Sequence, residues 1–409
     1  MVPRLRSVAA RLSGGRAWVL VAVALGWLFV LGGRFLLPTV LPQVKATFDV
    51  GNAGAGLAVS VLWAAYAVMQ APGGVLIDRV GERALLAGSL ALAGGAVVVV
   101  GLAPTYLVFV AGCGLFGLTT GLYGPARGTT ISRSFPRNDS TAIGVTLAAG
   151  SVGSAVLPFV AGSLVGRVGW RLLLGALLAP FVAVAGLAWA AVPARQADGD
   201  ASPPDARSLA RDVFGAVRMP AVSRSVAAVT CLLFAYQGLT AFLPTYLVEV
   251  KGFDQSTAAG LFALLFVAGA GSQLLAGGVA DRIGERSVLV VTAVVACVSA
   301  AALPFVDGLV PTAVVVAAAG TRLAMAPVSN AYVIDVLPPS VQGSAWGVIR
   351  TGLFLVGAGG STFVGAFADR GLFDDAFFVL AGLAAVAAVL YLGLPSRTAA
   401  KRERTVVGR

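Results

Sequence analysis

Four arginines lie inside long apolar stretches of this 409-residue chain: Arg34, Arg127, Arg322 and Arg350. An ionisable side chain in the middle of a bilayer costs about 2.5–3.5 kcal/mol on insertion scales, so such residues usually have a function. No Asp or Glu falls in the middle of any of these stretches. The four guanidinium groups therefore lack an internal partner, and the chemistry that they indicate is the binding of an anion.

The chain also contains an internal repeat. The segment 70–83 reads QAPGGVLIDRVGER, and the segment 273–286, which lies 203 residues later, reads QLLAGGVADRIGER. The tripeptide Leu-Pro-Thr at 37–39 recurs at 243–245. Similarity at matching places of the two halves indicates a duplicated architecture.

The four arginines break this repeat, because each has an uncharged counterpart in the other half. The counterpart of Arg34 is Thr240, and that of Arg127 is Asn330. The counterpart of Arg322 is Thr119, and that of Arg350 is Leu147. A scaffold does not need such asymmetry, so it favours a site. Tyr236 and Gln237 lie one helical turn from Thr240, and we therefore add these three residues to the predicted site.

Composition indicates a membrane protein. Of all residues 58% are hydrophobic and 11% are charged, and the mean hydropathy is +0.91, whereas soluble domains carry about 25% charged residues. We therefore expect no enzyme. Histidine is absent and the three cysteines lie in apolar runs, so we expect no metal and no cofactor. The net charge of +11 is spread over short loops, which argues against nucleic acid.

Twelve apolar stretches have the 17–25 residues or more that a membrane-spanning helix needs. They are 17–44, 53–76, 84–104, 106–132, 141–165, 171–192, 223–248, 257–280, 287–306, 311–333, 344–367 and 376–394. The sequence predicts an all-α integral membrane protein with twelve transmembrane helices in two pseudo-symmetric six-helix bundles. The expected divisions are a tail (1–16), a bundle (17–192), a polar linker (193–222) with a short amphipathic helix at 208–217, a second bundle (223–394) and a tail (395–409).

Orientation follows from the basic residues, which are retained on the cytoplasmic side of a membrane. The tails, the linker and the loops on their side of the predicted spans hold most of the arginines, while the other side has few basic residues. We expect both termini to be cytoplasmic and the protein to be a multi-pass protein of the plasma membrane, which is the inner membrane in bacteria.

The two copies of Gly-x-x-x-Asp-Arg-x-Gly-x-Arg, at 74–83 and 277–286, resemble the signature loop of the major facilitator superfamily. The resemblance implies a transporter that works by alternating access, with this loop acting in conformational switching. The predicted gating residues are Gly74, Asp78, Arg79, Gly81, Arg83, Gly277, Asp281, Arg282, Gly284 and Arg286.

Each part of the loop also has a physical interpretation. Gly74 and Gly277 would permit close helix approach, and Gly81 and Gly284 a tight turn. The two aspartates would cap a neighbouring helix as a clasp between the halves, while the last arginine of each copy would face lipid headgroups.

In the same family, spans one, four, seven and ten line the central cavity, and three of the four arginines fall on them. The span that holds Arg34 is similar to that of the organic-anion and organophosphate branches, but the organophosphate arginine of span seven is replaced by Thr240. The resemblance implies a small, carboxylate-like organic anion, held by Arg34 with Arg322 or Arg350. Arg127 is assigned to gating or to substrate contact.

Two other functions stay open. One is multidrug or metabolite efflux by proton antiport, although span five lacks the Gly-Pro-x-x-Gly-Gly run of drug antiporters. The other is a membrane receptor or scaffold that transports nothing. Exchange, uniport and symport all stay open, and with them a coupling ion or an exchanged anion as partner. We expect a monomer in the lipid bilayer.

Overall fold

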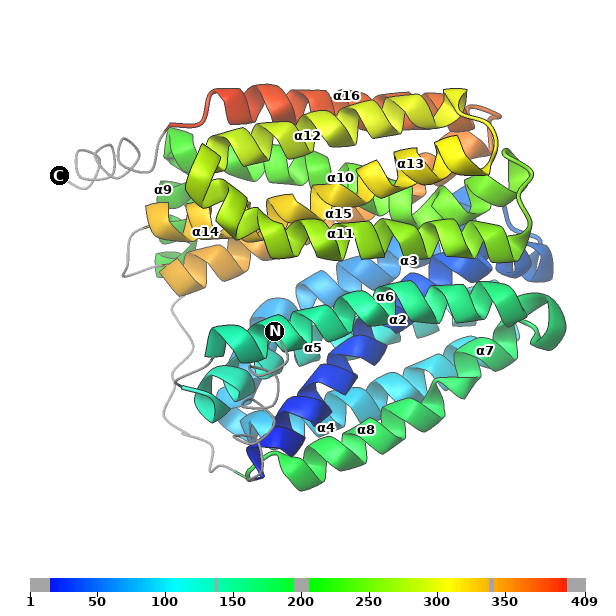
Figure 1. The fold of residues 1–409 in the computed structure, drawn as a ribbon. Helices are drawn as coiled ribbons and strands as arrows, with labels where there is room; N and C mark the ends of the chain where they lie inside the picture. The colour runs from blue at the N-terminus through cyan, green and yellow to red at the C-terminus, as the bar shows by residue number, and fades with distance from the viewer. Residues whose placement is uncertain (1–14, 137–138, 195–205, 338–341, 396–409) are drawn as a thin grey trace, which may run out of the picture.

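The computed structural model describes residues 15–136, 139–194, 206–337 and 342–395, and every regular element in these ranges is helical (Figure 1). The elements are α2 (Arg16–Phe48), α3 (Asn52–Val68), α4 (Gln70–Gly101), α5 (Tyr106–Ser134), α6 (Asp139–Val168), α7 (Trp170–Ala176), α8 (Leu178–Ala191), α9 (Ala206–Arg218), α10 (Pro220–Glu249), α11 (Gln255–Ile283), α12 (Glu285–Ala302), η1 (Leu303–Phe305), α13 (Leu309–Gly320), η2 (Thr321–Ala324), α14 (Met325–Val336), α15 (Gln342–Ala368) and α16 (Phe373–Leu392). The predicted all-α class is confirmed.

Twelve crossings of the bilayer can be traced through the described helices. Eleven helices or directly joined helices are long and apolar enough to span it. The twelfth span consists of the 17-residue α3 and the first part of α4, which follow each other across Met69 in nearly helical conformation. Span six joins α7 to α8, and span ten consists of α13, η2 and α14.

The repeated loop is shorter than the sequence indicated. We expected span two to end at 76 and span three to begin at 84, but the chain is helical on both sides of a single turning residue, Gly81, with φ 77°. Gly284 makes the same turn between α11 and α12, with φ 84°. Only glycine adopts these angles at low cost, so the predicted tight turns are confirmed at both positions.

The helices form two bundles (Figure 1). The N-terminal bundle comprises α2 to α8, and the C-terminal bundle comprises α10 to α16. Between them α3 packs on α15, and α6 packs on α11. The repeat relates span two (α3) to span eight (α11) and span five (α6) to span eleven (α15). The contact of α3 with α15 therefore corresponds to the contact of α11 with α6, which is the pseudo-symmetry that the repeat predicted.

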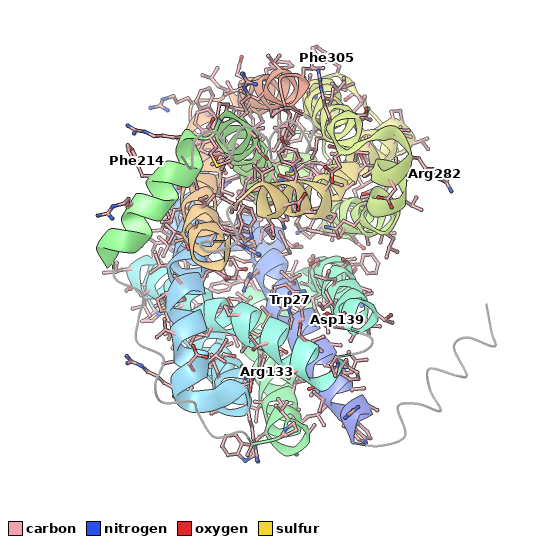
Figure 2. All side chains as sticks on the ribbon, turned by 90° about the vertical axis from the view of Figure 1, so that its left-hand side faces the viewer. Trp27, Arg133, Asp139, Phe214, Arg282 and Phe305 are labelled. Carbon is pink, nitrogen blue, oxygen red and sulfur yellow. The ribbon has the colours of Figure 1, made fainter. Side chains whose placement is uncertain are left out.

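The two ends of the helices define two sides of the molecule. We call the end at which α2 begins and α16 ends the α9 side, because α9 lies there (Figure 1). The other end is called the opposite side. The amphipathic helix predicted at 208–217 is confirmed as α9, and its Phe214 points outward (Figure 2). Residues 1–14, 195–205 and 396–409, which include most of both predicted tails and part of the linker, lie outside the described residues.

Small residues allow the helices of each bundle to pack closely. A methyl group on Gly153 of α6 would lie 2.1 Å from the carbonyl oxygen of Leu28 on α2. Such contacts drive helix association in membranes, where lipid is as apolar as the side chains. Large apolar side chains such as Leu107, Leu274 and Phe305 are mostly exposed, as expected for a surface in contact with lipid.

Polar caps begin two of the helices on the opposite side. Thr105 Oγ1 accepts a hydrogen bond from the Val108 amide at the start of α5. Asp254 accepts hydrogen bonds from the Ser256 and Thr257 amides at the start of α11. The hydrogen bonds from the Thr257 hydroxyl group and from these amides hold the pKa of Asp254 below its ordinary value.

Candidate functional site

Arg34 lies on α2 inside the N-terminal bundle, with 1% of its surface exposed. It donates two hydrogen bonds to Thr120 of α5, from Nε to Oγ1 (3.2 Å) and from Nη2 to the carbonyl oxygen (3.0 Å). Its guanidinium carbon lies 3.9 Å from the ring centroid of Tyr66 on α3. Thr120 therefore fixes the orientation of the guanidinium group, and the ring of Tyr66 stabilises its charge.

Arg127 lies on α5, the helix that also holds Thr120. Its guanidinium carbon is 4.5 Å from the ring centroid of Trp27, and Nη1 donates a hydrogen bond to Thr146 Oγ1 (3.1 Å). Arg127 Nε and Trp27 Nε1 are buried, and neither has an acceptor among the residues that the structure describes. Buried donors are rarely left unsatisfied, so these two neighbouring groups mark a place for an acceptor.

Arg350 comes from the other bundle, on α15, and is partly buried. Its charge acts on Tyr66 and on Arg127 of the N-terminal bundle. One turn later on the same helix, Phe354 packs against Tyr66, with 5.4 Å between ring centroids, and stacks on Trp63 at 6.2 Å. We call Arg34, Arg127 and Arg350, with the rings of Trp27, Trp63 and Tyr66, the central arginine cluster.

No acidic side chain compensates this cluster within the described ranges. The ion pairs found there join Lys45 to Glu249, Arg133 to Glu82, and Lys251 to Asp307. None of them includes an arginine of the cluster, so no carboxylate of the described residues lies within 4 Å of these three arginines. Positive charges at short range in a low-dielectric interior attract an anion strongly.

Arg322 has different surroundings from those that the sequence indicated. It lies on η2, where span ten is interrupted, and its guanidinium carbon is 4.1 Å from the ring centroid of Tyr236. It lines a small cavity inside the C-terminal bundle, between α10, α12, α13 and α16. Arg322 thus lies over an aromatic ring of its own bundle, and Arg34 likewise lies over the ring of Tyr66 in the N-terminal bundle. The expected pairing of Arg34 with Arg322 is not among the contacts that the structure forms.

The other predicted residues, Tyr236, Gln237 and Thr240 on α10, differ in whether they offer a free polar group to a ligand. Tyr236 packs under Arg322, and the Thr240 hydroxyl donates a hydrogen bond to the Tyr236 carbonyl oxygen (2.7 Å). The amide nitrogen and oxygen of Gln237 are buried, and in the described part of the chain they have no hydrogen-bond partner. Thr240 thus has no free donor for a ligand, while Gln237 has both a donor and an acceptor.

Sequence reasoning missed Thr120, the residue that holds Arg34. The signal was present, because two hydroxyl residues, Thr119 and Thr120, occur together in an apolar span, but only Thr119 was used, as a counterpart in the repeat. Tyr66 and Trp63 could complete a site by their position in a span, but they received low weight, because an aromatic residue there is more often a packing residue. Their role becomes visible only from the arginines around them.

The predicted gating glycines differ in what they do in this structure. Gly81 and Gly284 make the turns described above. A methyl group on Gly74 or Gly277 would meet no atom within 4 Å, so the close approach predicted there is wrong for this conformation. The tight contact falls one residue earlier, at Gly73, where a methyl group would lie 3.3 Å from the ring of Pro125.

The charged gating residues do not form a clasp in this conformation. Among the described residues, no hydrogen bond or ion pair involves Asp78 or Asp281. Arg83 is partly buried, and its guanidinium carbon lies 4.4 Å from the ring centroid of Trp189 on α8. Arg79, Arg282 and Arg286 are exposed on the α9 side, where Figure 2 shows Arg282 pointing outward.

The two bundles instead meet on the opposite side. Asp369, which follows α15, accepts hydrogen bonds from the backbone amides of Asn52 (2.6 Å) and Ala53 (2.8 Å) and so caps α3 of the other bundle. Lys45 pairs with Glu249 at 2.9 Å. Hydrogen bonds between the bundles, as far as the chain is described, all lie toward this side. The structure is therefore closed on the opposite side, where the polar contacts between described residues of the two bundles are found.

A comparison with known protein families identifies the chain. Residues 23–321 and 273–407 match the model of the Major Facilitator Superfamily. The protein is similar to three curated relatives. OpdE of Pseudomonas aeruginosa, named a transcription regulatory protein, is 27% identical over 92% of this chain and 93% of its own. SauU of Cupriavidus necator, named a probable sulfoacetate transporter, is 25% identical over 66% of both chains.

The third relative is the multidrug resistance protein Stp of Mycobacterium tuberculosis, 29% identical over 37% of this chain. That match covers only 29% of the Stp protein, which is less than a third of its length.

Solved structures of similar fold are membrane transporters. A bacterial homologue of the human lysosomal transporter Spinster has a TM-score of 0.76 and 18% identity, and covers 93% of this chain and 97% of its own. The nucleoside transporter NupG has a TM-score of 0.77 and 15% identity over 93% of this chain and all of its own. At this identity the likeness shows the fold. Together with the family match across nearly all of the sequence, it establishes that this multi-pass membrane protein belongs to the major facilitator superfamily of transporters.

Proposed function

We propose that the protein transports a small organic anion, of carboxylate type, across the membrane by alternating access. The observation that carries this proposal is the central arginine cluster, in which three guanidinium groups have no carboxylate within 4 Å among the described residues. The cluster joins both bundles, since Arg350 comes from α15 and the other two arginines come from α2 and α5. A ligand bound there would contact both halves, as alternating access requires.

The geometry supports distinct roles within the cluster. Arg34 is oriented by Thr120 and offers its remaining N–H groups, while Arg127 Nε and Trp27 Nε1 are buried donors without an acceptor in the described chain. Charge-assisted hydrogen bonds from such donors to a carboxylate are about twice as strong as neutral ones. The rings of Trp63 and Tyr66 form an apolar wall for the organic part of the substrate. The name of SauU, a probable sulfoacetate transporter, agrees with an organic anion as substrate.

An uptake screen with the purified protein in liposomes tests this function. Labelled mono- and dicarboxylates, phosphate esters and cationic drugs are each offered with imposed pH and voltage gradients. The proposal requires uptake of a carboxylate above the level of empty liposomes. The dependence on each gradient then separates exchange, uniport and symport.

A second candidate is the efflux of apolar or cationic compounds. It is favoured by the aromatic walls around Trp63, Tyr66 and Phe354, which can bind apolar rings, and by the partial match to the multidrug resistance protein Stp. Transport of cationic drugs but of no anion in the same screen would replace the first candidate by this one. Binding of a carboxylate without transport would favour a receptor, which is compatible with the regulatory name of OpdE.

We further propose that the α9 side is cytoplasmic, in the plasma membrane, with both termini on that side. Arg79, Arg133, Arg218 and Arg282 are on the α9 side, and basic residues near spans are retained in the cytoplasm. A single cysteine in place of Asp307, which is exposed on the opposite side, is then expected to react in intact cells with a reagent that does not cross membranes. Labelling only after cell lysis would reverse the orientation.

We also propose that the bundles 17–192 and 223–394 move as units and that Asp78 and Asp281 form a clasp when the α9 side closes. Replacing both by Asn removes two charges that have no hydrogen-bond or ion-pair partner among the described residues in the present conformation. The variant is therefore expected to bind substrate normally but to transport it several-fold more slowly, measured as the ratio of uptake rate to binding affinity. A normal rate would contradict the clasp.

A further inference from the structure

A small cavity inside the C-terminal bundle is separate from the central arginine cluster. It has a volume of about 20 Å³ and lies between α10, α12, α13 and α16. Its polar lining consists of Arg322, Tyr236 and Ser299, and the remaining lining residues are Leu and Ala. This space holds about one water-sized species, so it is too small for an organic carboxylate.

No acidic side chain among the described residues neutralises the charge of Arg322. The side chain is 93% buried, since only 7% is exposed, and no ion pair in the described ranges includes it. Its Nε is buried and has no acceptor there. The ring of Tyr236, at 4.1 Å, offers partial compensation. An isolated buried charge still costs several kcal/mol, so the cavity beside it favours a species of opposite charge.

A water molecule is a poor occupant of this cavity. Buried waters are held by two to four polar groups, and the Ser299 hydroxyl, which donates to the Val295 carbonyl oxygen (2.7 Å), could only accept from a water. A water could accept the Arg322 Nε–H, but it would leave the charge uncompensated. A monatomic anion satisfies both the donor and the charge.

We infer that the cavity beside Arg322 is a binding site for a single chloride-sized anion, distinct from the transport site. Position favours this assignment, because Arg322 lies on η2, where the α-helix of span ten is interrupted, and η2 packs on α11, α12, α13 and α14 of its own bundle. The bound ion would neutralise Arg322 and stabilise the interrupted span. It would not need to be transported.

The test measures the melting temperature of the purified full-length protein in sodium chloride and in sodium gluconate of equal ionic strength. Chloride is expected to raise the melting temperature of the parent with saturation, on the order of 5 °C at a hundred times its Kd. Arg322→Gln is expected to lose this response. Arg34→Gln is expected to keep it, which separates this inference from the proposed function, since Arg34 belongs to the transport site.

Two further measurements keep the result decisive. If Arg322→Gln does not fold, Ala300→Leu fills the same cavity without removing the charge, and its response to chloride is also expected to disappear. Crystals grown in bromide are expected to show an anomalous peak next to Arg322 Nε. A chloride response that survives in either variant, or a cavity without bromide, would overturn the assignment.

Discussion

The Arg34→Gln variant is expected to take up the carboxylate at about one-tenth to one-hundredth of the parent's rate at low concentration. A hydrogen bond to a charged group contributes about 1.5–3 kcal/mol, and each 1.4 kcal/mol is a factor of ten in affinity. Arg34 is held by two hydrogen bonds to Thr120 and stacks on Tyr66, so its guanidinium group is preorganised. The measurement is the initial rate of uptake into liposomes.

Three other variants test whether the loss of uptake is due to the guanidinium group of Arg34. Arg34→Lys is expected to restore only part of the rate, because an ammonium group cannot make the planar two-pronged contact of arginine. Thr120→Val removes the hydroxyl that orients Arg34 and is expected to weaken uptake less than Arg34→Gln. Arg167→Gln removes an exposed arginine on the opposite side and is expected to leave the rate unchanged. Equal uptake by the parent and by Arg34→Gln would exclude Arg34 from the site.

The Gly365→Val variant is expected to lose transport by blocking closure of the opposite side. A methyl group on Gly365 of α15 would lie only 2.3 Å from the carbonyl oxygen of Asn52 on α3, which is backbone and cannot move alone. Overpacking costs about 1–3 kcal/mol, and a penalty paid only in the closed conformation shifts the equilibrium by roughly 5- to 150-fold. The contact lies between bundles, so each bundle is expected to fold.

Spin labels can follow this equilibrium directly. Labels at Arg167 and Asp307, both exposed on the opposite side, are expected to report longer distances in Gly365→Val than in the parent. Asp369→Asn weakens the cap on α3 and is expected to shift the same distances by a smaller amount, since a helix cap contributes about 1 kcal/mol. Gly382→Val is the matched control, because a methyl group there meets no atom within 4 Å. Parental distances in Gly365→Val would contradict the blocked closure.

Much of the fold could be predicted from the sequence, because its signals are local. Apolar stretches of spanning length determine the helices, and the repeated motif determines where the chain turns. Gly81 and Gly284 adopt φ values of 77° and 84° at equivalent places, and this follows from their being the glycines of short turns. The boundary at Met69 was not predictable, since α3 and α4 continue each other without a change in composition.

The sequence by itself also determined which charges have no local partner, because an arginine in an apolar span is visible without coordinates. Only the tertiary structure decided which of these arginines lie together. Arg350 approaches Tyr66 of the other bundle, while Arg322 turns into its own bundle toward Tyr236. Helix rotation and tilt set these neighbours, and contacts such as Asp369 with Asn52 join residues more than 300 positions apart. The periodicity of a single helix carries no information about which other helix its face will meet.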